Sequence, residues 1–341
     1  MTMSRRRFLT VAALVGATVL SSLYGCSKPP ETKTPKAEPL QKLVIKGPMS
    51  PPTILLAHLA GQESLKASVG QVDFSTYKDP DAVRAGITSG ELQVAAVPTY
   101  MAANLYNRGI DVRLVNVTVW GILHVMTAED GLKTWSDLAG KTVVVPFKGD
   151  MPDLVFRYLA KQNGLDLEKA VKVQYVAAPT EAMQLLLAGK AEAAVLHEPV
   201  ATSVQIQGQQ KGMKVRSMLD LQQEWAKATG REARIPQAGI MVTGALAKSH
   251  PEVVQAIENG LKASVDWALQ NPAAAAELGA PHLGDMKPPV IEKSLSRTPL
   301  KWVPATEAKA ELEFFFSRLM ELSPDIVGGK LPDAGLYWKG K

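Results

Sequence analysis

Short apolar runs alternate with amphipathic stretches along most of this chain. An apolar run at 43–45 is followed by a glycine-containing turn and a helix-like stretch over 54–60. Residues 72–77 alternate between apolar and polar, as a half-buried strand does. A second helical stretch over 80–90 leads to a third apolar run at 92–97. Because each helix supplies the crossover that parallel strands need, this order predicts a parallel α/β unit.

The same order of elements returns about 100 residues later. The apolar runs 143–145, 171–176 and 191–196 correspond to the three strands of the first copy. Gly90 and Gly189 stand at matching positions, where they end helices as C-caps. Few residues are identical between the copies, but the order and spacing of the elements agree. The pattern therefore predicts two α/β lobes, each with helices covering a mostly parallel sheet.

The segments outside the repeat predict how the lobes are joined. Two strand-like segments, 112–118 and 122–127, flank Trp120 and Gly121, and a strand over 239–243 is expected to return to the first lobe. Two crossings between lobes form a hinge, and hinges of this kind close over ligands.

The C-terminal part of the chain turns helical. A helix over 250–270 is predicted to start at Ser249 as its cap, with Glu252 reaching back. Its buried stripe is predicted to be Val254, Ile257, Leu261, Val265 and Leu269. A helix from near Pro304 carries a second stripe, expected to pack in the core: Leu312, Phe315, Phe316, Leu319 and Leu322.

These elements predict a division of the chain into parts. The expected parts are a signal peptide with a lipobox (1–26), a proline-rich tether (27–42), lobe 1 (43–130 plus about 236–300), lobe 2 (131–235), and a C-terminal helical segment packing back on the lobes (301–341).

The N-terminus is typical of an exported lipoprotein. Arginines at 5–7 precede an apolar run over 11–23, which is shorter than the about 20 residues of a membrane-spanning helix. The run ends in Leu-Tyr-Gly-Cys at 23–26, which resembles the lipobox cleaved by signal peptidase II. Cys26 is the only cysteine, so it cannot form an internal disulfide, and lipid on its sulfur would consume the free thiol. We expect a membrane-anchored protein at the cell membrane or periplasmic face.

Two export routes remain open. Ser4, Phe8 and Leu9 surround the arginines as in a twin-arginine signal, whereas three arginines also orient an ordinary Sec signal. Without residues 1–26 the Lys and Arg count falls from 38 to 35 against 33 acidic residues, a nearly neutral body. This balance argues against a nucleic-acid partner. No later segment is apolar enough to span a membrane.

Four segments carry a resemblance to a known family. They are Ser-Asp-Leu-Ala-Gly-Lys-Thr-Val-Val-Val-Pro at 136–146, Leu-Leu-Ala-Gly-Lys-Ala-Glu-Ala-Ala-Val at 186–195, Glu-Pro-Val-Ala-Thr at 198–202, and Gly-Gly-Lys-Leu-Pro-Asp at 328–333. Together they resemble the nitrate/sulfonate/taurine-type substrate-binding proteins of ABC transporters, over roughly 43–335. The resemblance implies a two-lobed type II periplasmic-binding fold that holds a small molecule and presents it to a permease with its ATPase. We expect a monomer without a cofactor.

Ligands of open α/β sheets bind beyond the carboxyl ends of the strands, where helix N-termini suit anionic or polar groups. The candidate loops of lobe 1 hold Ser50, Pro51, Thr53, Thr99 and Tyr100. Those of lobe 2 hold Lys148, Gly149, Asp150, Asp153, His197 and Glu198. Trp120 at the crossover is a candidate for stacking on a planar ligand. The alternative for each is capping or loop chemistry.

Glu198 carries the most information about the ligand. With His197 it replaces the small Pro98-Thr99 pair of the first copy. A buried carboxylate needs a cation or a hydrogen-bond donor, which favours an amine, amidine or heterocycle as ligand. The alternative is that Glu198 pairs with a cation of the protein or caps the next helix. Lys148 favours an anion, and a zwitterion would satisfy both.

Two other classes of function compete with transport. A sensing lipoprotein that feeds a signalling receptor would have the same sequence features, and neighbouring genes would distinguish it. A related branch of the fold makes a thiamine pyrimidine with a cysteine-rich iron site, but Cys26 is the only cysteine here. The five histidines show no metal-ligand spacing, and P-loop, Gly-x-Ser-x-Gly and Rossmann signatures are missing. We expect neither a metal site nor an enzyme.

Overall fold

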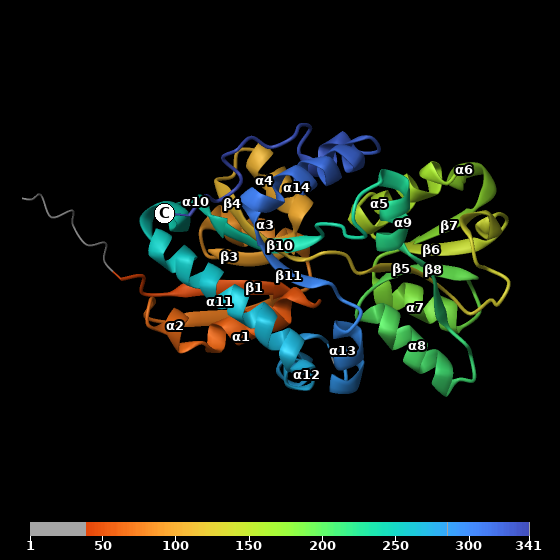
Figure 1. Cartoon of the computed structure of the whole chain (residues 1–341), viewed down its shortest axis with the longest axis horizontal. Helices are drawn as coiled ribbons and strands as arrows, with labels where there is room; N and C mark the ends of the chain where they lie inside the picture. The colour runs from red at the N-terminus through yellow and green to blue at the C-terminus, as the bar shows by residue number, and fades with distance from the viewer. Residues whose placement is uncertain (1–38, 285, 341) are drawn as a thin grey trace, which may run out of the picture. The chain divides into compact units, whose positions relative to one another are not determined.

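The computed structural model describes residues 39–284 and 286–340 (Figure 1). The predicted signal peptide, Cys26 and residues 27–38 of the predicted tether lie outside the described residues. Residues 37–341 form one compact unit, which contains two separate sheets with their helices. In Figure 1 the first sheet lies on the left and the second on the right.

The first sheet has six strands in the order β11-β4-β10-β3-β1-β2. These are β1 (Leu43–Pro48), β2 (Val72–Tyr77), β3 (Val94–Pro98), β4 (Val112–Val119), β10 (Ala238–Thr243) and β11 (Leu300–Pro304). β1 pairs in parallel with both β2 and β3, while β10 runs antiparallel between β3 and β4. The predicted return of the chain to the first lobe is confirmed.

The second sheet has five strands in the order β7-β6-β8-β5-β9. These are β5 (Leu123–Thr127), β6 (Thr142–Pro146), β7 (Lys172–Val176), β8 (Ala193–His197) and β9 (Arg216–Asp220). β6 pairs in parallel with β7 and β8, just as β1 does with β2 and β3. The predicted duplication of the strand and helix order is confirmed.

Helices cover both sheets. With the first sheet go α1 (Pro52–Gly61), α2 (Glu63–Lys66), α3 (Pro80–Ser89), α4 (Thr99–Asn107), α10 (Gly244–Ser249), α11 (Pro251–Gln270), α12 (Pro272–Gly279), α13 (Pro288–Leu295) and α14 (Ala305–Met320). With the second go α5 (Met151–Gln162), α6 (Leu167–Ala170), α7 (Pro179–Leu187), α8 (Val200–Gln210) and α9 (Leu221–Thr229). Short 3-10 turns are η1 (Trp135–Leu138), η2 (Ala280–His282) and η3 (Pro324–Val327). We call the two groups, each with its sheet, lobe 1 and lobe 2.

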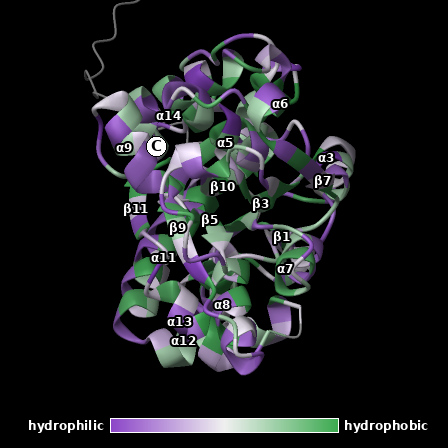
Figure 2. Cartoon of the chain, turned by 90° about the vertical axis from the view of Figure 1, so that its right-hand side faces the viewer, coloured by the Kyte–Doolittle hydropathy of each residue, from purple (hydrophilic) through white to green (hydrophobic). Residues whose placement is uncertain are grey.

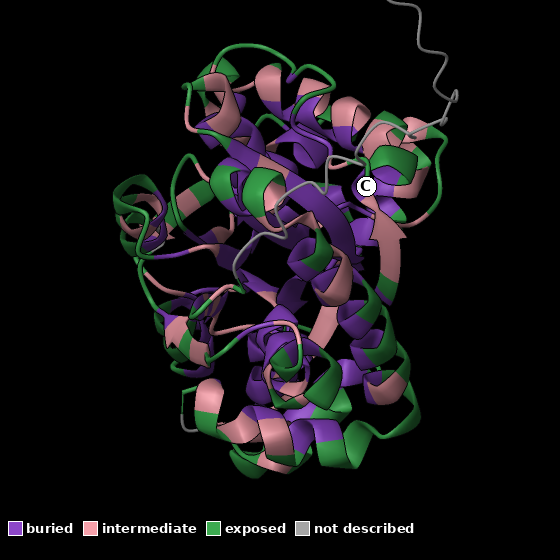
Figure 3. Ribbon diagram, turned by 90° about the vertical axis from the view of Figure 1, so that its left-hand side faces the viewer, coloured by how far each residue is buried: buried purple, intermediate pink, exposed green. Residues whose placement is uncertain are grey.

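The central strands are buried on both faces. Val94, Ala95, Ala96 and Val97 of β3 have no exposed surface, so both sides of the sheet are packed. Hydrophobic residues concentrate on the strands in Figure 2, and exposed residues on the outer faces of the helices in Figure 3. Burial of these apolar runs, at about 25 cal/mol per Å², is the main force that holds each lobe together.

The sheets divide the chain differently from the predicted ranges at two places. β5 lies within the range predicted for lobe 1 (43–130), but it pairs with β8 and β9 of the second sheet, because the chain already crosses at Trp120. β11 lies almost wholly in the segment predicted to be helical (301–341), yet it pairs with β4 at the edge of the first sheet.

Two details of α11 also differ from the prediction. Ser249 does not cap it: Ser249 ends α10 and its hydroxyl donates to the carbonyl of Ala245, while Pro251 takes the first helical position, which suits proline. Leu269 is 53% exposed, whereas Ala268 is 1% exposed. At 3.6 residues per turn the stripe that starts at Val254 reaches 268 rather than 269.

Candidate functional site

The loops at the carboxyl ends of the strands meet between the lobes. Tyr100 stands in the first turn of α4 in lobe 1, and its phenol interacts with the carboxylate of Asp150, the N-cap of α5 in lobe 2. Burial, followed by the charge of Asp150, raises the pKa of the Tyr100 phenol well above its ordinary value. The phenol is therefore neutral.

A second contact between the lobes joins Arg297 to Glu198. Arg297 lies between α13 and β11, and its Nε is 3.0 Å from Oε1 of Glu198, which follows β8. Arg297 also donates from Nη1 to the side chain of Gln205 in α8. The other carboxylate oxygen of Glu198 accepts the backbone N–H of Thr202 at 3.0 Å. The sequence analysis gave two alternatives to a ligand as the partner of Glu198, and both are present. Arg297 is the protein cation, and the bond to Thr202 caps α8.

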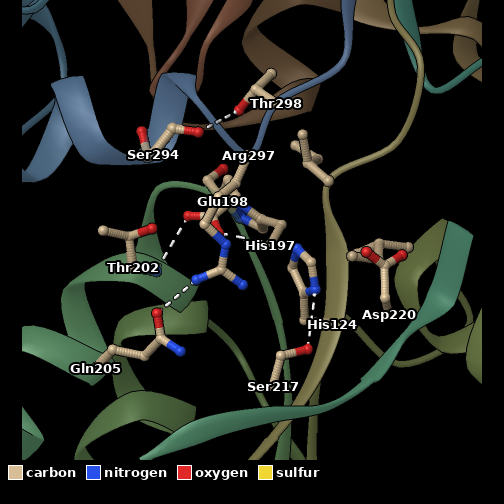
Figure 4. A network of polar contacts seen from close by, with 12 residues as sticks. His124, His197, Glu198, Thr202, Gln205, Ser217, Asp220, Ser294, Arg297 and Thr298 are labelled. Carbon is tan, nitrogen blue, oxygen red and sulfur yellow. Dashed lines mark hydrogen bonds and ion pairs between the residues drawn. The ribbon is translucent and has the colours of Figure 1, made fainter.

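Two histidines border this contact (Figure 4). His124 of β5 is buried, with Nε2 3.8 Å from Oε1 of Glu198, and His197 Nδ1 lies 2.8 Å from the carbonyl of Glu198. Burial lowers the pKa of both imidazoles, so both are neutral at neutral pH. Burial also raises the pKa of Glu198, and Arg297 opposes that rise. The network therefore places a charged pair beside uncharged imidazoles.

Several polar atoms of this network have no hydrogen-bond partner among the described residues. They are Nε2 of His124 and Oγ1 of Thr202, both buried. Oε1 of Glu198 likewise accepts no hydrogen bond in the described part of the chain, although it is ion-paired with Arg297. Buried polar groups without partners are rare in proteins and need an explanation.

The loop after β6 contains a strained residue that the sequence analysis missed. Phe147 has φ of 58°, in the left-handed region that non-glycine residues avoid, and it is 38% exposed. Strain of this kind concentrates at ligand clamps and switches. The signal in the sequence was an aromatic residue between Pro146 and the Lys148-Gly149 pair of a strand-to-helix turn.

The predicted residues of this loop bind one another. Asp153 is buried and accepts hydrogen bonds from the N–H of Gly149 at 2.8 Å and from the hydroxyl of Tyr175 at 3.1 Å. Lys148 is exposed, with Nζ 5.2 Å from the centre of the Tyr175 ring. Asp153 therefore braces the loop, and ligand contact by Lys148, Gly149 and Asp150 stays a prediction.

The predicted residues of lobe 1 also make internal contacts. The hydroxyls of Thr53 and Thr99, both fully buried, donate to the carbonyls of Pro48 and Pro236. The N–H of Ser50 donates to Pro48, and Pro51 is the buried N-cap of α1. Ligand contact by these residues stays a prediction.

Trp120 is enclosed at the crossover. It is 1% exposed, its ring faces Arg234 with the guanidinium carbon 4.7 Å from the ring centre, and its indole N–H donates to Lys301 at 2.8 Å. In this structure a protein cation thus occupies the place expected for a planar ligand.

Arg297 and His124 were not foreseen. Neither belongs to a recognisable motif: His124 reaches Glu198 because β5 pairs with β8 in the second sheet, and Arg297 reaches it from lobe 1. A hollow of about 450 Å³ opens beside this contact, lined by Gln205 and Gln209 of α8 and by Lys293 of α13 among others.

Across residues 39–284 and 286–340 no group of three His, Cys, Asp or Glu side chains is arranged to hold a metal ion. No helix in the same ranges has the length and hydropathy needed to cross a membrane.

Two α/β lobes joined by two crossings, with polar loops meeting at their strand ends, define a binding protein that closes on a ligand. A family model described as ABC transporter, phosphonate, periplasmic substrate-binding protein matches residues 62–264, and the chain belongs to this family. It is therefore the extracytoplasmic substrate-binding component of an ABC importer, and its fold is the type II periplasmic-binding fold. Its partners are a small molecule and the other transporter components.

Solved structures share this fold. An ABC transporter structure from Parabacteroides distasonis is 24% identical, with a TM-score of 0.70 over 89% of this chain and 100% of the other. The periplasmic aliphatic sulphonate binding protein SsuA from Escherichia coli is 17% identical, with a TM-score of 0.69 over 87% and 97%. The desulfurization enzyme DSZB is 14% identical, with a TM-score of 0.59 over 85% and 94%. A search of curated protein sequences found no match.

Proposed function

We propose that this protein captures a small organic oxyanion, a phosphonate or a sulfonate, between its lobes and delivers it to the importer. The family description names phosphonate, and the protein from Escherichia coli with the same fold is described as binding aliphatic sulphonates. Both groups are compact anions with three oxygens on a tetrahedral centre, so one kind of site suits both.

The observation that carries this proposal is the chemistry of the helix starts in lobe 1. α1 and α4 begin at the carboxyl ends of β1 and β3, where Tyr100 already contacts lobe 2. Both helices lie wholly within the described part of the chain, and neither has a side-chain cap or an acidic residue in its first turn. By contrast α3 starts at an aspartate cap. Helix N-termini without a negative side chain attract anions.

The pairing of Glu198 supports an anion over an amine. The expectation of an amine, amidine or heterocycle rested on a buried carboxylate that needed a cation. Arg297 supplies that cation from within the protein, at 3.0 Å. The carboxylate therefore gives no reason for a positively charged ligand, and Arg297 adds a cation to the region between the lobes.

The proposal includes how the protein works and where it is held. The protein retains its ligand without turning it over, acts as a monomer, and has no nucleic-acid partner. It is exported by the twin-arginine or the Sec route and anchored by lipid on Cys26, with the proline-rich segment 27–42 as a leash. Such a leash keeps the lobes near the permease.

Native mass spectrometry of the purified full chain, followed by calorimetry, tests the proposal. We expect binding of methylphosphonate or ethanesulfonate, and no binding of ethylamine. Recovery of the bound compound unchanged after prolonged incubation is expected for a binding protein. Binding of the amine alone, or conversion of the ligand, would overturn the proposal.

A further inference from the structure

Oε1 of Glu198 faces a second hydrogen-bond acceptor, Nε2 of His124. We assign the proton of His124 to Nδ1, because the hydroxyl of Ser217 has the carbonyl of Leu219 as its acceptor at 3.3 Å and Ser217 Oγ, 3.2 Å from Nδ1, then accepts from the imidazole. A neutral imidazole with its proton on Nδ1 has a lone pair on Nε2. That lone pair lies 3.8 Å from Oε1 of Glu198, with no hydrogen bond to Nε2 from any described residue.

Oε1 is ion-paired with Nε of Arg297 at 3.0 Å, but neither Oε1 nor Nε2 of His124 accepts a hydrogen bond from a described residue, so a donor brought by a ligand would complement both. Two nearby backbone N–H groups are already engaged: that of Glu198 donates to Ile122 at 2.9 Å, and that of Thr202 donates to Glu198 at 3.0 Å. The hydroxyl of Thr202 has no partner among the described residues and lies in the same network. Arg297, from the other lobe, brings the positive charge to this point. The arrangement fits an anion that also carries a proton.

Phosphonates and sulfonates differ in whether the anion keeps an acidic proton. The second pKa of a phosphoryl group lies near neutrality, about 6 for a phosphate ester, so a phosphonate keeps one O–H in its monoanion. A sulfonate is fully ionised and has only acceptor oxygens. Beside a buried carboxylate, the phosphonate would donate its O–H, whereas the sulfonate would place negative oxygens against a negative carboxylate.

We propose that Glu198 is a specificity-determining residue that makes this protein prefer an oxyanion with an acidic proton, a hydrogen phosphonate, over a sulfonate. In the proposed complex the lobes open, the anion enters between Arg297 and Glu198, and they close again. Arg297 then binds the charged oxygens, and Glu198 accepts the O–H. The inference rests on the proposed function, since it concerns which of the two oxyanions the same site takes.

The experiment compares methylphosphonate with methanesulfonate, which match in size, by calorimetry of the full chain at pH 6. We expect the wild type to bind methylphosphonate at least about tenfold more tightly, since a site built for a substrate hydroxyl rejects the analogue that lacks it. In Glu198→Gln an amide N–H replaces the negative oxygen, so the preference should disappear or reverse. Glu307→Gln, an exposed change in the first turn of α14, is the control and should keep the wild-type ratio.

The outcomes separate the inference from the proposed function. A wild type that binds methanesulfonate as tightly as methylphosphonate overturns the inference and leaves the proposed function standing. A preference for methylphosphonate that Glu198→Gln leaves unchanged overturns it too, because Glu198 then serves only to pair with Arg297. Failure of the wild type to bind either compound counts against the proposed function itself. If Glu198→Gln does not fold, the wild-type ratio together with Thr202→Val, expected to weaken methylphosphonate more than methanesulfonate, decides the question.

Discussion

Arg297 of lobe 1 and Glu198 of lobe 2 form an ion pair across the boundary between the lobes, with Nε and Oε1 3.0 Å apart. The carboxylate is fully buried, while the arginine side chain is 23% exposed. Because the two residues belong to different lobes, opening of the hinge must separate them and expose Glu198 to water. The pair therefore reports on the contact between the lobes, and its removal tests what holds them together.

Loss of Arg297 should destabilise the protein. In Arg297→Ala the buried carboxylate loses its cation, and breaking a buried pair costs about 3–5 kcal/mol. We expect less than this, since Arg297 is partly exposed. The double variant Arg297→Met with Glu198→Gln should recover most of the loss, because no buried charge is left. Urea unfolding measures both, and equal losses in the single and double variants would contradict this explanation.

Tyr100→Phe should loosen the contact between α4 and α5. The variant removes only the hydroxyl that interacts with the carboxylate of Asp150 across the boundary between the lobes. Hydrogen exchange should then become faster at the start of α5 in lobe 2. Tyr77→Phe is the matched control, because its hydroxyl donates to Ala96 within lobe 1. Faster exchange at α5 in the control as well would mean that the effect is not specific to Tyr100.

The stability of lobe 1 should depend on pH through Glu258. Burial raises the pKa of this carboxyl from 4.5 to about 7, while Asn116 and Trp302 donate hydrogen bonds to it. Between these two pH values the folded state keeps a proton that the unfolded state has lost. The free energy of unfolding therefore falls as pH rises from 4.5, by up to about 3 kcal/mol, and levels off above 7.

Glu258→Gln isolates this contribution. The variant should be more stable than the wild type at pH 8, and the difference should vanish toward pH 4, because the wild-type carboxyl is then protonated in both states. Urea unfolding of both proteins at several pH values measures it. A difference that does not change with pH would show that Glu258 stays ionised in the folded protein.

Two substitutions of Phe147 distinguish the effect of its backbone strain from the effect of its ring on ligand binding. Phe147→Gly should stabilise the protein by about 1 kcal/mol, because glycine adopts the left-handed φ of 58° without the steric cost. Phe147→Ala keeps the strain and removes the ring. If the ring contacts the ligand, both variants should bind it more weakly, as calorimetry would show. Equal stability of the two variants would contradict the assignment of strain to this residue.

Much of the fold follows from patterns that are local in the sequence. The alternation at 72–77, the apolar runs at 43–45 and 143–145, and the helices between them predict two parallel α/β units. Period 2 and period 3.6 are properties of a single segment, so one sequence suffices to detect them. The stripe over Val254 and Leu261 of α11 was predicted for the same reason, and it failed only at its last residue.

What the sequence by itself determined about this protein is the order of its elements and the loops where a ligand was expected. Which partner Glu198 takes was decided by the tertiary structure alone, because Arg297 and His124 reach it from other strands and from the other lobe. The same holds for β5 and β11, whose sheets depend on where the chain crosses. Contacts between distant segments depend on how whole lobes pack, and no periodicity within one segment carries that information.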